Sequence, residues 1–122
     1  MLKNLLLVGL GGGVGSMARY LCHKWLGTSG QGFPTATLLV NISGCLLIGL
    51  LFGLTLRNGA AHEAWKLVLM TGFCGGFTTF SAFTLEGNLL LRDDKLGLFL
   101  LYIGASVIIG LVATWIGIKI TR

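Results

Sequence analysis

Apolar residues fall into four long runs, which short polar or glycine-rich connections separate. A helix that crosses a bilayer needs about 20 consecutive, mostly apolar residues, and each run reaches that length. The pattern therefore predicts an all-α protein with four transmembrane helices in one domain, residues 1–122. The predicted spans are residues 4–26, 35–56, 67–91 and 96–118.

The composition supports an integral membrane protein. Hydrophobic residues make up 54% of the 122 residues and charged residues only 11%, whereas charged residues are about 25% of an ordinary soluble domain. The net charge is +5, but the basic residues are scattered along the chain. They form no basic stripe of the kind that binds nucleic acid, and we expect them at the membrane edges.

The first span begins like a secretory signal peptide, with Lys3 before an apolar segment and Ser16-Met17-Ala18 as a conceivable cleavage site. We expect it to be kept as a helix, because the apolar segment continues to Trp25 and three more spans follow. Its glycine pairs at 9/13 and 11/15 have the spacing that lets membrane helices approach closely. The same glycines imitate a dinucleotide-binding loop, but the acidic residue that such a loop needs about 20 positions later is missing.

The third span contains an unusual stretch from Gly72 to Glu86, with three glycines and several hydroxyl residues at membrane depth. Lipid offers no hydrogen-bond partner to backbone groups that leave a helix. The stretch is either a plain helix whose glycines allow close packing, or a helix broken near Gly75, Gly76 and Thr78 that lines a site.

The residues after these glycines favour a helix that lines a site. Phe80 and Phe83 share one helical face, while Thr79, Phe83 and Glu86 share a neighbouring stripe. Aromatic edges, hydroxyls and a carboxylate therefore line one side of the span.

Polar side chains also lie inside the other spans. Asn41, one turn after Thr37, is either glue between helices or a donor to something in a pore. Tyr102 is either a packing residue or part of a pore. Arg19 is costly at a helix centre, by about 2.5 to 3.5 kcal/mol, unless it snorkels to the membrane edge or finds a partner.

The cysteines and histidines predict no metal site. Cys22, Cys45 and Cys74 lie in apolar segments without the spacing of a zinc site or a disulfide framework. His23 and His62 lie near the ends of spans with no ligand partner at a suitable spacing, and we expect both to be solvated.

The lysines and arginines are nearly balanced between the two sides of the predicted four-span topology. One side has 5 of the 9 and the other has 3, or 4 if Arg19 snorkels there. So small a positive-inside bias leaves open insertion in both orientations. The first group is Lys3, Arg57, Lys66, Lys119 and Arg122, and the second is Lys24, Arg92 and Lys95.

Four short helices enclose little polar surface alone, so their buried polar groups favour an oligomer. The smallest closed assembly with both orientations is an antiparallel homodimer, as in inverted repeats. A pore with amide and hydroxyl donors and the positive edges of phenylalanine rings suits a small anion. No ATP-binding loop is present, so we expect passive transport and no enzyme activity.

Several motifs resemble the small bacterial fluoride channels called Fluc or CrcB, and the resemblance covers the whole chain. The motifs are Gly12-Gly13-Val14-Gly15, Arg19-Tyr20, Thr37-Leu38-Leu39-Val40-Asn41 with Gly44, and the stretch from Gly72 to Phe83 with Glu86.

The resemblance implies a fluoride-selective channel in the bacterial inner membrane that lowers fluoride toxicity by passive export. By that resemblance Phe80 and Phe83 of two subunits meet the ion with their ring edges and Asn41 donates an amide hydrogen. It also implies a structural sodium ion at the centre of the dimer, held by the backbone carbonyls of Gly75 and Thr78. The rest of the predicted fluoride pathway is Thr79, Ser81, Tyr102, Glu86 and Arg19.

The chain departs from the family pattern at Ala36, Ala82 and Gly110. The second and third changes thin the predicted hydroxyl track. Two alternatives belong to other classes: a proton-coupled exporter of hydrophobic cations, and a structural subunit without transport. The exporter needs an accessible carboxylate in the first span, where this chain has Arg19.

Overall fold

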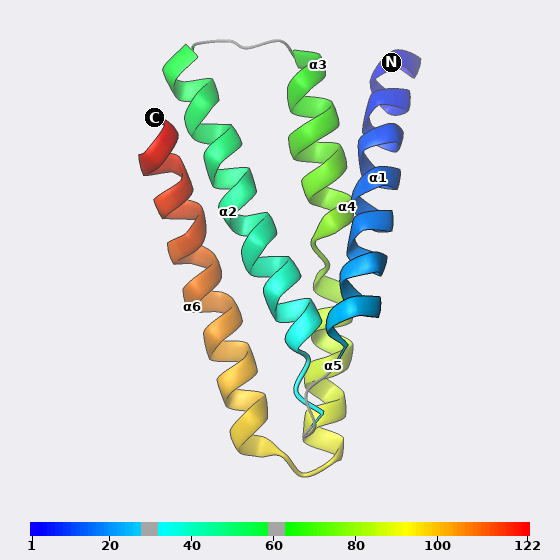
Figure 1. Cartoon of the computed structure of the whole chain (residues 1–122), viewed down its shortest axis with the longest axis vertical. Helices are drawn as coiled ribbons and strands as arrows, with labels where there is room; N and C mark the ends of the chain where they lie inside the picture. Colours follow the sequence, from blue (N-terminus) through cyan, green and yellow to red (C-terminus); the bar gives the residue numbers. More distant parts are fainter. Residues whose placement is uncertain (28–31, 59–62) are drawn as a thin grey trace.

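The computed structural model describes residues 1–27, 32–58 and 63–122. Four helical segments are long and apolar enough to cross a membrane, and each contains one predicted span. Both termini lie at one end of the bundle (Figure 1). The prediction of an all-helical chain with four spans is confirmed. The segments are Leu2–Leu26, Thr35–Asn58, Glu63–Arg92 and Leu96–Thr121.

Three of these segments are single helices, whereas the third is composite. α1 is Leu2–Leu26, α2 is Thr35–Asn58 and α6 is Leu96–Thr121. The third segment consists of α3 (Glu63–Trp65), the π-helical η1 (Lys66–Cys74), α4 (Gly75–Phe77) and α5 (Phe80–Arg92). α1 ends where Gly27 takes a positive φ of 61°, a conformation that glycine adopts without steric cost.

α1 packs on η1 and α4 through one of its two glycine stripes. A Cβ atom at Gly11 would collide with the backbone of Val68, and one at Gly15 with the backbone of Phe73. At Gly9 and Gly13 it would meet no described atom within 4 Å. The 11/15 pair thus brings two backbones together, while the 9/13 pair faces away from the described chain.

α2 and α6 form the other closely packed pair. A Cβ at Gly49 would collide with the carbonyl of Thr114, and one at Gly117 would collide with the Leu46 carbonyl of α2. The Thr114 hydroxyl donates to the Cys45 carbonyl at 3.0 Å, and the Thr121 hydroxyl donates to Leu50 O at 2.7 Å. Small residues and hydroxyl bonds therefore hold these helices together, as is common in membranes.

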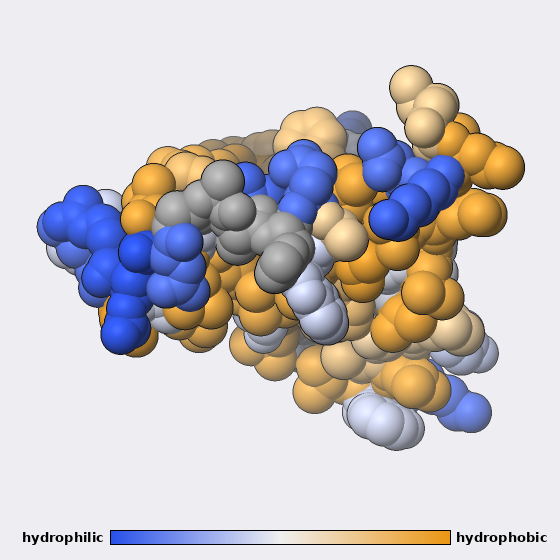
Figure 2. Space-filling view, turned by 90° about the horizontal axis from the view of Figure 1, so that it is seen from above, coloured by the Kyte–Doolittle hydropathy of each residue, from blue (hydrophilic) through white to orange (hydrophobic). Residues whose placement is uncertain are grey.

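The outside of the bundle is apolar. Leu10, Ile108 and Leu111 are more than 60% exposed, which suits a surface in contact with lipid. Seen from the end, hydrophilic side chains cover helix ends and hydrophobic side chains follow the flanks (Figure 2). This distribution fits a bundle that spans a bilayer.

Candidate pore-lining site at the interruption of the third span

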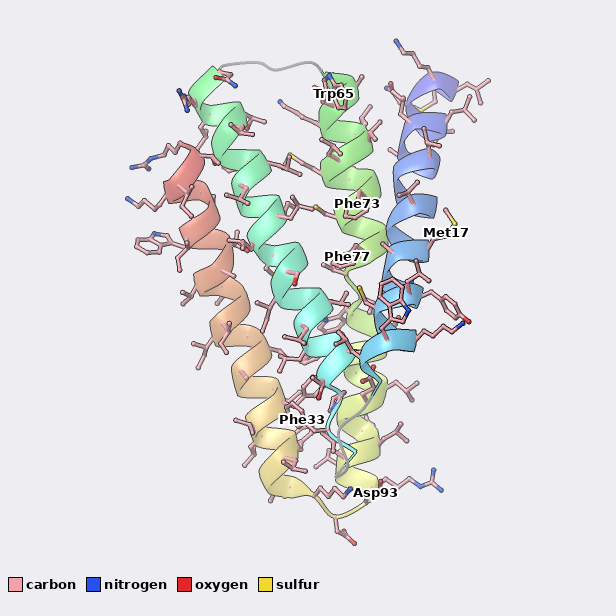
Figure 3. All side chains as sticks on the ribbon, viewed as in Figure 1. Met17, Phe33, Trp65, Phe73, Phe77 and Asp93 are labelled. Carbon is pink, nitrogen blue, oxygen red and sulfur yellow. The ribbon has the colours of Figure 1, made fainter. Side chains whose placement is uncertain are left out.

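Two extended residues separate α4 from α5. Thr78 has φ −84° and ψ 158°, and Thr79 has φ −150° and ψ 124°. The neighbouring Gly75 is itself helical, with φ −63° and ψ −36°, and a Cβ at Gly76 would collide with the Gly12 carbonyl of α1. Close approach to α1 therefore explains Gly76, whereas the extended conformation belongs to the two threonines. The rings of Phe73 and Phe77 stack just before this point, with 5.5 Å between their centroids (Figure 3).

At this interruption, the side chain of Asn41 on α2 forms hydrogen bonds with the backbone of Thr79. Its Nδ2 donates to Thr79 O at 3.1 Å, and Thr79 N donates to its Oδ1 at 2.9 Å. An amide side chain has a donor and an acceptor side by side, so it can pair with both backbone groups of one extended residue. In this chain Asn41 is a link between helices, and the bond to Thr79 uses one of its two amide hydrogens.

In a continuous helix, Thr79 N would donate to Gly75 O and Ala82 N would donate to Thr78 O. At the interruption both amides have other partners. In an α-helix these carbonyls accept from the residue four positions later. Thr79 N donates instead to Asn41, and Ala82 N donates to Thr79 Oγ1 at 3.2 Å, which caps α5. Two carbonyls at membrane depth therefore lose their usual partners.

Arg19 of α1 binds a third carbonyl at the same place. Its Nε donates to Gly76 O at 3.1 Å. Of the two predicted alternatives, snorkelling and pairing, the structure shows pairing, with a backbone carbonyl as the partner. A cationic donor satisfies such a group better than a neutral donor does.

Aromatic rings lie along the start of α5. Phe83 lies 5.7 Å from Phe80 and 5.1 Å from Tyr102 between ring centroids, and Tyr102 meets Phe33 edge to face at 5.7 Å. Tyr102 is fully buried, whereas Phe80 is 75% exposed. The rings thus form a path from the outer surface of the single chain towards its interior.

Two buried hydroxyls beside this path lack a hydrogen-bond partner within the described part of the chain. They are Tyr102 Oη and Ser106 Oγ, both on α6. Leaving a buried polar group unpaired costs about 1 to 3 kcal/mol. A bound species that accepts hydrogen bonds would remove that cost.

An open groove of about 520 Å³ runs over the same region. Its lining includes Asn41, Thr78, Thr79, Phe80, Phe83 and Ser106. It therefore joins the interruption, the phenylalanine pair and one of the unpartnered hydroxyls on a single surface.

Glu86 leads to two residues that sequence reasoning did not assign to the site. Thr37, which is fully buried, donates from Oγ1 to Glu86 Oε1 at 2.5 Å, and His23 Nε2 lies 2.9 Å from the same Thr37 oxygen. His23 is half-buried and both of its ring nitrogens have partners, so the expectation that it is simply solvated is wrong. His23 and Thr37 are 14 positions apart, and Thr37 and Glu86 are 49 apart. No local spacing in the sequence connects them. His62 lies outside the described residues.

The predicted site residues thus fall into three groups. Asn41, Gly75, Thr78 and Thr79 meet at the interruption, and Ser81 Oγ lies 3.2 Å from Thr79 Oγ1. Phe80, Phe83 and Tyr102 form the ring path. Glu86 and Arg19 each bind a different helix, through Thr37 and Gly76 respectively.

Comparison with known proteins points in one direction. Residues 6–118 match the family model described as CrcB-like protein, Camphor Resistance (CrcB). A Flavobacterium psychrophilum protein named fluoride-specific ion channel FluC is 45% identical, over 99% of this chain and 98% of its own length. Proteins of the same name from Prosthecochloris aestuarii and Chlorobium luteolum are 44% and 46% identical, over 97% and 94% of this chain and 92% and 89% of their own lengths. Four apolar spans and these relatives make the chain a multi-pass bacterial membrane protein, and it belongs to the CrcB-like family.

Proposed function

We propose that the protein is a fluoride-selective channel that exports fluoride passively and so lowers its concentration in the cytoplasm. The observation that carries this proposal is the pair of unpartnered buried hydroxyls of Tyr102 and Ser106 beside the Phe83 ring. Fluoride is a small, strong acceptor of hydrogen bonds, and both hydroxyls can donate to it. The names of the relatives provide independent support.

The proposed path runs along the groove past Phe80 and Phe83 and continues to Tyr102, whose ring contacts Phe83. Phenylalanine ring edges carry partial positive charge, and the second amide hydrogen of Asn41 is a further donor. Thr79 and Ser81 add hydroxyls at the same level, and Arg19 adds positive potential from α1. An anion that leaves water needs such replacements for its hydration shell.

We infer that two copies form an antiparallel homodimer around this groove. The open groove places polar groups of Asn41, Thr78 and Thr79 in the membrane region, where lipid offers them no hydrogen-bond partner. A second copy in the inverted orientation would cover this groove, in the manner of inverted repeats. The near balance of basic residues between the two sides permits both orientations.

The carbonyls of Gly75 and Thr78 suit a structural sodium ion at the centre of that dimer. The described residues contain no group of three His, Cys, Asp or Glu side chains that could hold a metal, so the ligands would be backbone oxygens. Both carbonyls have lost their helical amide partners, and carbonyl oxygens replace the hydration shell of alkali cations. The ion would satisfy the interruption and lend positive potential to the anion path.

Fluoride efflux from proteoliposomes tests the proposed function. With an ionophore to compensate charge, we expect protein-dependent release of fluoride without ATP or a proton gradient, and no release of chloride. A fluoride electrode in the external buffer measures it, with protein-free liposomes as the control.

Two results would favour the alternative functions. Release that requires an opposing proton gradient indicates a coupled exporter. No release from liposomes that contain folded protein indicates a structural subunit.

Gly75→Val tests the proposed contact between copies at the interruption. A Cβ at Gly75 meets no described atom within 4 Å, so one chain by itself can accept the change. We expect loss of dimer and of fluoride flux, whereas Gly9→Val, at an equally open position on α1, should keep both. Gel filtration and efflux are the measurements, made in sodium and in a large organic cation.

The ligands in this proposal are backbone atoms, so Thr78→Ser should behave as the unmodified chain does. An intact dimer and normal flux in Gly75→Val, unchanged when sodium is replaced, would contradict both the dimer contact and the ion.

A further inference from the structure

Three helices are joined by a chain of hydrogen bonds that no part of the proposed path requires. His23 Nδ1 lies 2.9 Å from Arg19 O, and His23 Nε2 lies 2.9 Å from Thr37 Oγ1. Thr37 Oγ1 lies in turn 2.5 Å from Glu86 Oε1, a separation typical of hydrogen bonds to a carboxylate. These hydrogen bonds therefore run from α1 through α2 to α5, and all three contacts are partly buried.

The number of hydrogens in this series of hydrogen bonds follows from the groups at its two ends, Arg19 O and Glu86. Arg19 O is a carbonyl and can only accept, so His23 Nδ1 carries a hydrogen. The contacts on either side of Thr37 each need one hydrogen, and the Thr37 hydroxyl supplies only one of the two. The other is on His23 Nε2 or on Glu86.

Two arrangements satisfy all three contacts. In one, His23 is an imidazolium and Glu86 a carboxylate. In the other, His23 is neutral with its hydrogen on Nδ1, and Glu86 is a carboxylic acid. The first becomes the second when the Nε2 proton moves to Thr37 Oγ1 while the Thr37 hydrogen moves to Glu86 Oε1. The summed charge of the two end groups is zero in both.

This proton matters for an anion because Glu86 borders the proposed path. Glu86 lies on α5, about one helical turn after Phe83, and the Phe83 ring contacts Tyr102. An uncompensated carboxylate there would repel fluoride. His23 lies in the last turn of α1, where the helix carries partial negative charge and favours a cation.

We propose that His23 is a positioning residue of the anion path: it supplies the proton that neutralises Glu86 through Thr37 and holds that carboxyl group against α2. This inference rests on the proposed channel function. The titratable and charged groups on the elements around His23 are Arg19, Cys22 and Lys24 on α1, Glu86 on α5 and Tyr102 on α6. Arg19 donates from Nε to Gly76 O. Glu86 is the acidic group that His23 reaches through Thr37.

The expected effect of replacing His23 follows from this proton. Without the His23 ring, one contact of Thr37 has no partner and Glu86 is left as a carboxylate with no compensating cation in the chain of hydrogen bonds. Fluoride flux should therefore fall. Two like charges a few ångströms apart in a protein repel strongly, and we expect a decrease of roughly tenfold.

Fluoride efflux from proteoliposomes, after subtraction of the leak from protein-free liposomes, tests the inference. His23→Gln should be slower than the unmodified protein. Adding Glu86→Gln to His23→Gln should restore part of the flux, because the double variant has no uncompensated carboxylate beside the path. His62→Gln, which changes the other histidine, should keep the original flux.

Nitrogen NMR of the histidine ring provides a readout that a purely structural role would not move. In the His62→Gln background, the folded protein should show a hydrogen on His23 Nδ1, because the Arg19 carbonyl can only accept. A neutral ring protonated only on Nε2 would overturn the proton count.

The outcomes separate this inference from the proposed function. Fluoride flux in His23→Gln equal to that of the unmodified protein would overturn the role of His23 and leave the proposed channel function standing. Absence of fluoride flux in the unmodified protein would overturn the channel, while the NMR result would still decide the proton count.

Discussion

Phe83→Ile is expected to remove almost all fluoride flux while leaving the protein folded. Isoleucine remains large and apolar, but it has no ring edge to face an anion and no ring to meet Phe80 and Tyr102. A fluoride ion that has left water depends on such partially positive edges, and the proposed dimer contains each ring twice. We expect a loss of at least about 100-fold in flux, measured by efflux from proteoliposomes.

Phe52→Ile is the matched control, because Phe52 lies on α2 outside the groove and is 44% exposed. It should transport fluoride at the normal rate. Leu90→Ile, a volume-conserving change at a buried position of α5, should cost less than about 1.5 kcal/mol of stability. Normal flux in Phe83→Ile would mean that the ring is only a packing residue.

Asn41→Asp is expected to damage both stability and transport. The carboxylate can still accept from Thr79 N, but it cannot donate to Thr79 O, so two acceptors would face each other where the amide now bridges them. A buried group that loses its partner costs about 1 to 3 kcal/mol, and more when charge is involved. We expect a lower unfolding temperature in detergent and a decrease in flux of more than about tenfold.

Asn88→Asp makes the same chemical change on the exposed side of α5, where Asn88 Nδ2 donates to Thr84 O at 2.9 Å. Its effect on stability should stay within about 0.5 kcal/mol, as for most surface substitutions. Equal behaviour of the two aspartate variants would show that the contact with Thr79 is dispensable.

The spans were predictable because their signal is local. Each needs only a run of apolar residues of sufficient length, and the helices contain all four predicted ranges. The glycines of the first span were also informative, but spacing alone could not distinguish the 11/15 pair, which packs on η1 and α4, from the 9/13 pair, which does not. That distinction depends on how the helix is rotated in the bundle.

The partners of the polar residues could not be predicted from spacing. Asn41 and Thr79 are 38 positions apart, and Arg19 and Gly76 are 57 apart. His23 was judged by its neighbours in the sequence, where no carboxylate is near, whereas the fold brings Glu86 to it through Thr37. The resemblance to a family identified the residues at the interruption, but it said nothing of this histidine.

The pairing of α1 with the third segment and of α2 with α6 is interleaved along the chain, and this has a consequence for biogenesis. The main partner of α2 is synthesised last, and Gly117 lies 68 positions after Gly49. At about 5 to 20 residues per second, Gly49 and its neighbours wait several seconds in the bilayer before Gly117 and Thr114 arrive. Insertion of the spans and their packing are therefore separate stages, and the bundle closes only after the ribosome has delivered the fourth span to the membrane.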